Sequence, residues 1–219
     1  MTNENINTQR HAVIVANGRY PNHPLPLSII ENAPYIICTD GAANHFISLG
    51  KIPDAIVGDC DSVSPENKKK YAHLLHPDTE QDSNDLTKSV RFAINQGRDI
   101  ITIVGGTGLR DDHTIGNISL LAEYQCAAQV KMVTNSGVFT PLNSYATLIS
   151  HKGEQVSIFA IDPKPITTHG LKYPIENRIL KNWWEGTLNE SEGDNFTIDT
   201  EGRVIVFQVF NSVNDKANK

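Results

Sequence analysis

Short, continuous apolar runs alternate with helical patterns through the first 140 residues, and this alternation constrains the fold most. The predicted strands span residues 11–17, 35–40, 55–59, 100–105 and 130–134. Continuous apolar character is typical of strands buried on both faces, and such strands form parallel sheets. Between them, 84–95 and 112–124 carry apolar residues at helical spacing, and Ser64-Pro65 is typical of a helix start. We therefore predict a doubly wound, mostly parallel α/β domain over residues 1–140.

The pattern changes in the last third of the chain. Strands are predicted at 145–150, 155–161, 196–199 and 204–210, with no convincing helix between them. The stretch 199–203 (DTEGR) is typical of a hairpin turn. We therefore predict a smaller antiparallel β-sandwich domain over residues 141–219.

Composition narrows the function classes. The 219 residues are 39% hydrophobic with a net charge of -6, and no dense basic run is present, which argues against a nucleic-acid partner. Three scattered cysteines form no CxxC pair. The polar N-terminus and the lack of a long apolar run predict a cytoplasmic protein without a membrane segment.

Polar clusters follow the predicted strands. They read DGAAN (40–44), GDCDS (58–62) and GGTGLRDDH (105–113), and a further cluster, QDSND (81–85), opens a predicted helix. In open α/β sheets, ligands bind beyond the carboxyl ends of the strands, so these clusters are expected to meet at one edge.

The GDCDS cluster gives the strongest chemical signal. If this segment is extended, Asp59 and Asp61 point to the same side and repel each other unless a cation lies between them. With Asp85 they offer the hard oxygen ligands that suit Mg²⁺, and Arg110 could hold phosphate oxygens. The P-loop and dinucleotide motifs are absent. The residues alone predict a Mg²⁺-dependent phosphoryl-transfer enzyme of unknown substrate.

Structural explanations compete at the other clusters. Asp82 or Ser83 could cap the helix that follows, and Asp112 could cap the next one. Gly105 to Gly108 could form only a tight turn, and a structural role for His113 is as plausible as a catalytic one.

The whole series of motifs resembles the thiamine pyrophosphokinase family. It comprises DGAAN, GDCDS, QDSNDLTK (81–88), GGTGLRDDHTIGN (105–117), GLKYP (170–174) and GTLNE (186–190), in order along nearly the whole chain. The resemblance implies an N-terminal α/β domain, a C-terminal β-sandwich, and a homodimer with active sites between subunits. It also implies transfer of the diphosphoryl group of ATP to the hydroxyl of thiamine, with Mg²⁺ as cofactor and AMP as the second product.

Family roles carry over position by position. The resemblance implies Mg²⁺ ligands at Asp59, Asp61 and Asp85, and catalytic roles for Asp59, Asp85 and Arg110. Nucleotide contacts are implied for Asp40, Gly41, Asn44, Gly106, Arg110, Asp112 and His113. Thiamine contacts are implied for Gln81, Asp82, Tyr173, Asn189 and Glu190. Aromatic candidates for the cationic thiazolium are Tyr173, Trp183 and Trp184.

Three positions depart from the family pattern. Asn84 stands where Thr is usual, Ala42 replaces a common Gly, and Leu188 replaces the usual Ser of an SNE-like motif. Leu188 removes a hydroxyl from the implied thiamine site, so the thiamine contacts depend on the remaining residues.

Two other functions stay open from the sequence. In a Mg²⁺-dependent phosphohydrolase, Asp59 would be the nucleophile and Lys88 the accompanying lysine. In a non-catalytic nucleotide or thiamine diphosphate binding module, the acids would only hold Mg²⁺. A pyrophosphokinase acting on another hydroxymethyl heterocycle is a substrate variant of the main prediction.

Overall fold

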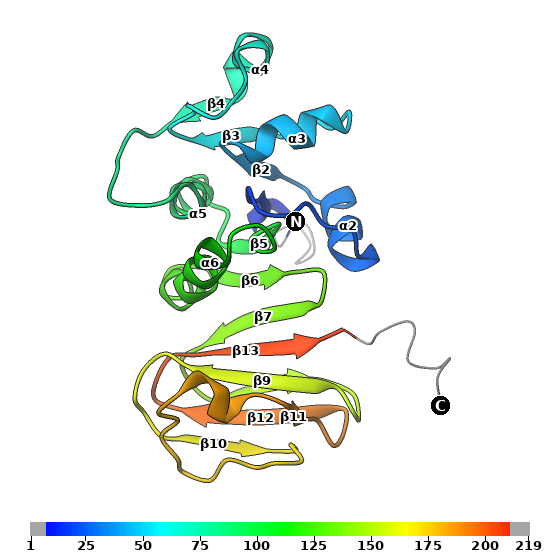
Figure 1. Ribbon diagram of the computed structural model, residues 1–219, viewed down its shortest axis with the longest axis vertical. Coiled ribbons are helices and arrows are strands. Elements are labelled where there is room, and N and C mark those ends of the chain that lie inside the picture. Colours follow the sequence, from blue (N-terminus) through cyan, green and yellow to red (C-terminus); the bar gives the residue numbers. More distant parts are fainter. Residues whose placement is uncertain (1–7, 211–219) are drawn as a thin grey trace. The chain divides into compact units, whose positions relative to one another are not determined.

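A computed structural model describes residues 8–210, which divide into two compact units, 8–135 and 136–210 (Figure 1). The strands of the first unit are β1 (His11–Val15), β2 (Ile36–Thr39), β3 (Ala55–Gly58), β4 (Leu75–Pro77), β5 (Ile100–Val104) and β6 (Gln129–Val133).

These strands form a parallel sheet in the order β6-β5-β1-β2-β3-β4. The interior residues of the strands, such as Ile14, Ile37, Ile56 and Ile103, are fully buried. The prediction of a parallel sheet from continuous apolar runs is confirmed. Since β1 lies between β2 and β5, the strand order reverses direction at β1.

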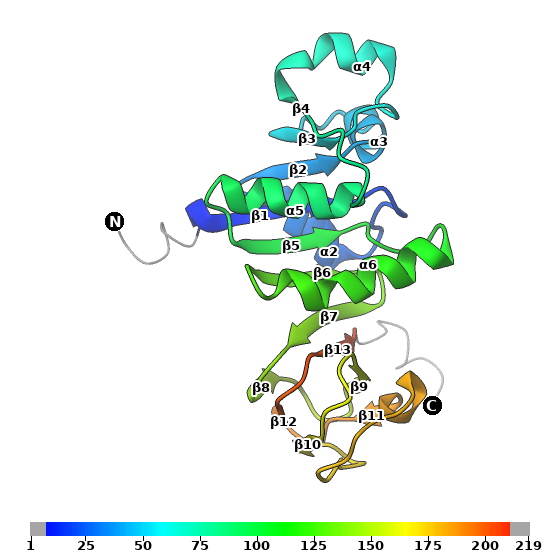
Figure 2. The ribbon, with the colours of Figure 1, turned by 90° about the vertical axis from the view of Figure 1, so that its left-hand side faces the viewer.

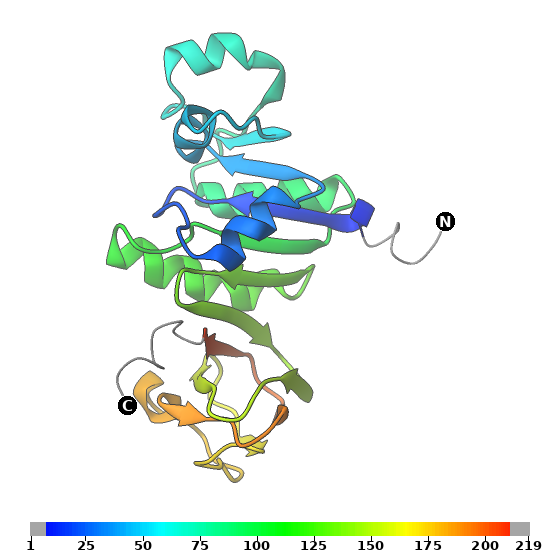
Figure 3. The same ribbon diagram turned by 90° about the vertical axis from the view of Figure 1, so that its right-hand side faces the viewer.

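Helices cover both faces of this sheet, which confirms the doubly wound prediction. The helical elements are α2 (Pro24–Glu31), α3 (Ala42–Ser48), α4 (Pro65–Lys70), the 3₁₀ turn η1 (Ala72–Leu74), α5 (Asp85–Asn95) and α6 (Asp111–Tyr124). Helices α5 and α6 lie over one face (Figure 2), and α2 and α3 over the other (Figure 3). Helix α5 buries Leu86, Val90 and Ala93, three residues of its predicted apolar stripe.

The helix starts agree only in part with the sequence prediction. Ser64 caps α4 by accepting from the Asn67 N–H at 3.2 Å, and Asn84 caps α5 by accepting from the Thr87 N–H at 2.9 Å. Asp112 is not a cap: α6 begins at Asp111 and has no side-chain cap. The Asp112 carboxylate instead lies in the first turn, where it bonds its neighbours.

The second unit is a sandwich of two antiparallel sheets, as predicted. Its elements are β7 (Gly137–Leu142), β8 (Ala146–Ile149), β9 (Gln155–Ala160), β10 (Ile166–His169), the 3₁₀ turn η2 (Trp183–Gly186), β11 (Asn189–Glu190), β12 (Asn195–Thr200) and β13 (Val204–Val209). Within this unit one sheet runs β11-β9-β13-β7 and the other β10-β12-β8. Both sheets contribute to one apolar core, which includes Ile158, Val206, Phe196 and Ile198.

The predicted hairpin at 199–203 is wrong. Strands β12 and β13 flank the turn, but β12 pairs with β8 and β10, whereas β13 pairs with β7 and β9. The chain therefore crosses from one sheet to the other. A local bond from the Gly202 N–H to the Thr200 hydroxyl (3.0 Å) shapes the turn, and Asp162 anchors Arg203 beyond it.

Sequence reasoning also missed several short elements: α2, α3, β4, β7 and β10. Helix α2 contains two prolines, and β4 is three residues long, so neither carries a full period of its pattern. Within residues 8–210 no helix combines the length and apolarity needed to cross a bilayer.

Candidate active site

The reversal of strand order at β1 positions the site. Beyond β1 and β5, two loops are joined by hydrogen bonds from the Gly18 N–H to the Gly105 carbonyl (2.7 Å) and from the Arg19 N–H to the Thr107 carbonyl (2.8 Å). A Cβ at residue 18 would collide with both of these carbonyl oxygens, so only glycine allows this close approach. The two loops are thus held together at the carboxyl edge of the sheet, where open α/β sheets bind ligands.

A pocket of about 310 Å³ lies at this point. It is lined by Ala16, Asn17, Gly18, Thr39, Asn84, Asp85, Leu86, Gly106, Thr107, Leu109, Arg110, His113, Thr114 and Asn117. The lining includes the first residues of α5 and the beginning of α6. Helix N-termini carry unpaired N–H groups and a partial positive charge, so two of them at one pocket favour an anionic ligand such as a phosphate.

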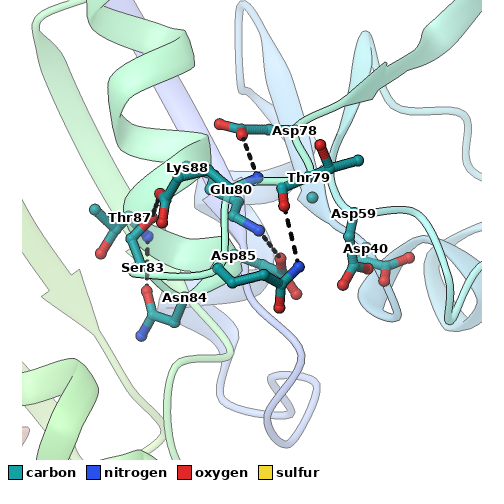
Figure 4. A network of polar contacts seen from close by, with 12 residues as sticks. Asp40, Asp59, Asp78, Thr79, Glu80, Ser83, Asn84, Asp85, Thr87 and Lys88 are labelled. Atoms are coloured by element: carbon teal, nitrogen blue, oxygen red, sulfur yellow. Dashed lines mark hydrogen bonds and ion pairs between the residues drawn. The ribbon is translucent and has the colours of Figure 1, made fainter.

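A group of carboxylates adjoins this pocket. Ligand atoms of Asp40, Asp59 and Asp61 all lie within 4.8 Å of one another. Asp85 lies beside them, because a Cβ at Gly58 would be 2.8 Å from the Asp40 Cβ and 3.0 Å from Asp85 Oδ1 (Figure 4). Asp85 also lines the pocket, so it connects the carboxylates to the anion-favouring space.

The loop that carries Asp59 and Asp61 is not extended, so this premise of the sequence prediction is wrong. Gly58 has φ 152° and Cys60 has φ 63°, a left-handed conformation that non-glycine residues rarely adopt. Cys60 is 7% exposed, and the turn lets the Asp61 N–H donate to Asp59 Oδ1 at 3.1 Å. The two carboxylates still come together, but through a tight turn rather than by strand alternation.

Asn44 holds this loop in place. Its Nδ2 donates to the Ser62 carbonyl (2.7 Å), and its Oδ1 accepts from the Ser64 N–H (2.9 Å) and from Asn67 Nδ2 (3.1 Å). These contacts give Asn44 a positioning role for the acidic loop. Its predicted contact with the nucleotide stays a prediction.

The carboxylates differ in their affinity for protons. Burial raises the pKa of Asp40 to about 6, and the Asp59 and Asp85 charges act in the same direction, whereas the N–H bond from Ser62 opposes the shift. The bond from the Asp61 N–H lowers the pKa of Asp59. Burial raises the pKa of Asp85, and the Lys88 charge opposes that rise. A bound cation would favour the ionised form of all three.

Lys88 is the buried counter-charge of this region. Its side chain is 3% exposed, and its Nζ lies 3.7 Å from Asp85 Oδ1 one turn earlier on α5 (Figure 4). The sequence left its position open; the structure places it beside the acids rather than in solvent.

At the same pocket, the lining residue Arg110 forms an exposed ion pair with Asp112. Arg110 Nε and Nη2 donate to the two carboxylate oxygens of Asp112 at 3.1 and 2.5 Å. The guanidinium and the His113 N–H bond lower the pKa of Asp112 to about 2. Arg110 and His113 line the pocket, and Gly106 contributes its carbonyl to Asn117 Nδ2 at 2.9 Å.

The loop that carries Gln81 and Asp82 is fastened to α5 by Glu80. The Glu80 carboxylate accepts from the Ser83 hydroxyl at 2.5 Å and from Arg91 Nη2 at 2.8 Å, and Arg91 also contacts the Ser83 hydroxyl. Gln81 and Asp82 are exposed at the surface of this loop. Asp82 lines a second hollow between α5 and α6 rather than the pocket at the strand ends.

Within the second unit, the predicted thiamine contacts lie together. Asn189 accepts from the Tyr173 N–H (3.0 Å) and donates to the Tyr173 carbonyl (2.7 Å), while Glu190 pairs with Lys172 at 3.2 Å. Tyr173 is exposed, and Leu188 is exposed with φ 60°, a strained backbone for a leucine.

The two tryptophans of η2 differ in their surroundings. Trp183 packs edge-on against Phe159 at 5.9 Å between ring centroids, whereas Trp184 is 72% exposed. Trp183 therefore packs on the sandwich although 42% of it is exposed, and Trp184 lies mostly at the surface.

Sequence reasoning missed the loop after β1 and the buried end of β2, which contribute Asn17, Gly18 and Thr39 to the pocket lining. It also gave no role to Thr114 and Asn117 of α6, which line the pocket as well. The signal for Asn17 and Gly18 is their position directly after the first strand, because ligands bind beyond the carboxyl ends of the strands in open α/β sheets.

The fold and the site define a class: proteins with a doubly wound α/β unit, a β-sandwich unit, and a pocket at the strand ends of the first unit that adjoins a group of carboxylates. Family models for "Thiamin pyrophosphokinase, catalytic domain" and "Thiamin pyrophosphokinase, substrate-binding domain" match residues 27–134 and 137–207. The chain is also 31% identical over 150 residues to the thiamine pyrophosphokinase of Bacillus subtilis, covering 64% of this chain and 70% of that protein. The chain belongs to the thiamine pyrophosphokinase family, and it is an enzyme of this kind, an ATP:thiamine diphosphotransferase.

Further relatives agree. Thiamine pyrophosphokinase 1 of Oryza sativa subsp. japonica is 27% identical over 201 residues, covering 78% of this chain and 75% of that protein. The crystal structure of thiamine pyrophosphokinase from Bacillus subtilis has a TM-score of 0.77 at 23% identity, covering 92% of this chain and 100% of that chain. The structure of thiamin pyrophosphokinase from Candida albicans has a TM-score of 0.74 at 19% identity, covering 94% of this chain and 91% of that chain. At these identities the structural likeness supports the fold.

Proposed function

We propose that the pocket at the strand ends binds ATP together with Mg²⁺, and that Asp59, Asp61 and Asp85 hold the metal with Asp40 beside them. The observation that carries this proposal is that a pocket favouring an anion directly adjoins a group of carboxylates favouring a cation. The pocket faces two helix N-termini and favours an anion, while the adjoining carboxylates favour a cation. A metal-bound polyphosphate satisfies both at once.

The donor set fits a divalent cation. All four groups are carboxylates, which are hard oxygen ligands. Asp40 is 2% exposed, and its Oδ1 has no donor among the described residues. A buried carboxylate oxygen without a donor costs free energy that a cation would offset. When bound, Mg²⁺ offsets the charge that develops on the transferred group.

The other predicted nucleotide residues take positioning roles in this proposal. Arg110 and His113 contribute from the start of α6, and Gly106 from the loop after β5. Asp112 orients the Arg110 guanidinium until phosphate oxygens compete for it. Gly41 is the N-cap residue of α3 directly after Asp40, where a Cβ would collide with Asn17 Nδ2.

We assign thiamine to Gln81, Asp82, Tyr173, Asn189 and Glu190, in a homodimer whose active sites lie between subunits. The exposed ring of Tyr173 and the exposed Trp184 support an aromatic surface for the cationic thiazolium. Leu188 supplies an apolar surface where the family pattern has a hydroxyl. The predicted cytoplasmic location and the predicted absence of nucleic-acid and membrane partners stay predictions.

In the transfer, the thiamine hydroxyl oxygen forms a bond to the β-phosphorus of ATP. The bond from that phosphorus to the oxygen bridging the α-phosphorus breaks, and AMP leaves. The hydroxyl proton passes to a carboxylate, and we assign Asp85 ahead of Asp59 because Asp85 lines the pocket. Arg110 would stabilise the phosphate oxygens during the transfer.

The direct test incubates the protein with ATP, MgCl₂ and thiamine and separates the products by chromatography, with thiamine omitted as the control. Equal amounts of thiamine diphosphate and AMP, both dependent on thiamine, are expected. Free phosphate or ADP released without thiamine would indicate the phosphohydrolase instead. Tight binding of thiamine diphosphate without turnover would indicate a binding module. Membership of the thiamine pyrophosphokinase family favours neither the phosphohydrolase nor the binding module.

A further inference from the structure

The GLKYP motif pairs with β11 and the residues that follow it in a short antiparallel ribbon of the second unit. The Lys172 N–H donates to the Glu190 carbonyl at 2.9 Å, and the Glu192 N–H donates to the Gly170 carbonyl at 3.0 Å. An exposed ion pair between Lys172 Nζ and the Glu190 carboxylate (3.2 Å) lies on the same ribbon. Two motifs that are distant in the sequence are therefore joined within one unit.

At Tyr173 a side chain replaces the backbone as the pairing partner. Leu188, just before β11, has φ 60°, and this left-handed conformation ends the extended run. Asn189 Oδ1 accepts from the Tyr173 N–H at 3.0 Å, and Asn189 Nδ2 donates to the Tyr173 carbonyl at 2.7 Å. One amide thus bonds both backbone groups of Tyr173, as a residue of a neighbouring strand would.

The Asn189 amide has little capacity left for a ligand. Its Oδ1 also accepts from the Glu190 N–H at 2.9 Å, so three of its four hydrogen-bonding positions are used within the chain. The residue is only 5% exposed. The Asn189 side chain is therefore engaged with the Tyr173 backbone, although the family resemblance implies a thiamine contact for it.

Tyr173 has the opposite exposure. It is 58% exposed, while its backbone N–H and carbonyl are both held by Asn189. An aromatic ring on a fixed backbone loses less conformational entropy when it binds a ligand than a ring on a free loop. The ligand that suits the face of such a ring is a flat organic cation.

We propose that Asn189 is a positioning residue, which fixes the Tyr173 backbone so that the exposed ring meets the thiazolium of thiamine. This role rests on the proposed function, because it takes thiamine to be the ligand of that ring. Within the group assigned to thiamine, Tyr173 makes the contact and Asn189 acts only through Tyr173.

The experiment is a double-mutant cycle of N189A, Y173A and the two changes together. The KM values for thiamine and for ATP are measured from thiamine diphosphate formation, with thermal unfolding in parallel. Y173A keeps the backbone groups that Asn189 bonds, and it should raise the KM for thiamine about tenfold. N189A should raise it about fivefold, because the ring is no longer held. The double variant should match Y173A, because no ring is left to position. The KM for ATP should stay unchanged throughout.

S191A is the matched control. Ser191 is fully buried in the same ribbon, and its hydroxyl bonds the Gly193 carbonyl (3.1 Å) rather than Tyr173. S191A should lower the unfolding midpoint, as N189A does, but leave the KM for thiamine unchanged. If N189A does not fold, N189D replaces it in the cycle, because N189D keeps both accepted bonds and loses only the donated one.

Two results would overturn the inference while the proposed function stands. A rise in the KM for thiamine that N189A still produces in the Y173A background would show that Asn189 contacts the substrate directly. An equal KM for thiamine in N189A and S191A would show that Asn189 has no specific effect on Tyr173. A wild-type protein that forms no thiamine diphosphate would instead remove the proposed function and the inference together.

Discussion

The two units differ in the groups that they leave without a partner. In the first unit these groups are polar and buried: within the part of the chain that the structure describes, all buried side-chain N and O atoms that lack a hydrogen-bond partner belong to it. In the second unit, buried polar side chains such as Asn189, Ser191 and Thr200 are hydrogen-bonded. The groups without a partner there are large apolar side chains exposed to solvent, namely Tyr173, Trp184 and Leu188.

This difference indicates how each unit would gain from a ligand. A metal-bound phosphate would supply the first unit with charges and acceptors that its interior lacks. The second unit would gain by covering aromatic surface with a flat organic cation or with another protein surface. Substitutions in the first unit should therefore separate activity from stability more sharply than substitutions in the second.

The largest effect is expected from removing charge at the acidic loop. D59N keeps the acceptor for the Asp61 N–H but removes a negative charge, so turnover should fall by about 10³-fold or more, with the unfolding midpoint unchanged or raised. Initial rates and thermal melts check this. D54N, at the opposite end of β3, keeps its bond to the Ile36 N–H and should retain activity. Equal losses in both variants would contradict the assignment.

The second effect concerns pH and the metal-free protein. Because the pKa of Asp40 is raised to about 6, its contribution to stability is fully present below about pH 4 and is lost as pH rises through about 6. D40N should therefore be more stable than wild type at pH 8, by at most about 3 kcal/mol, and not at pH 4. Denaturant unfolding in EDTA measures this. Adding MgCl₂ at pH 8 should stabilise wild type more than D40N, and a pH-independent difference would refute the account.

A smaller effect is expected at the tryptophan pair of the second unit. W184A should raise the KM for thiamine about tenfold without lowering the unfolding midpoint, because Trp184 is exposed. W183A should lower the midpoint, because Trp183 packs on Phe159. Sedimentation of both variants serves as a check, since dissociation of W184A with unchanged thiamine KM would assign this residue to a protein contact instead.

The smallest effect is expected at the fastening of the 80–83 loop. R91A removes the ion pair with Glu80, so the KM for thiamine should rise a few-fold, and 0.5 M salt should reduce the difference from wild type. R10A is the matched control, since the Arg10–Asp99 pair is similarly exposed but lies at the other edge of the sheet. An identical response of R10A would mean that the loop is held by other contacts.

Much of the first unit could be predicted because its strands are buried on both faces, and such strands have continuous apolar runs in the sequence. The acidic loop was also found, but its conformation was not, since a left-handed Cys60 is set by tertiary packing and has no local signature. The burial of Lys88 and the unpaired hydroxyl of Thr39 likewise depend on which elements pack against them. The sandwich was predicted from its strands, whereas the crossing at 199–203 was not, because a turn sequence does not reveal whether the next strand joins the same sheet.

The position of β13 in the second unit has a consequence for biosynthesis. Residues 204–209 form the strand that pairs with β7 on one side and β9 on the other, so those two earlier strands have no common partner until it emerges from the ribosome. The strands of the first unit are complete by residue 133. The parallel sheet of the first unit can therefore fold first during translation. The sandwich cannot be completed until β13 is synthesised, and until then β7 and β9 each expose an unpaired strand edge.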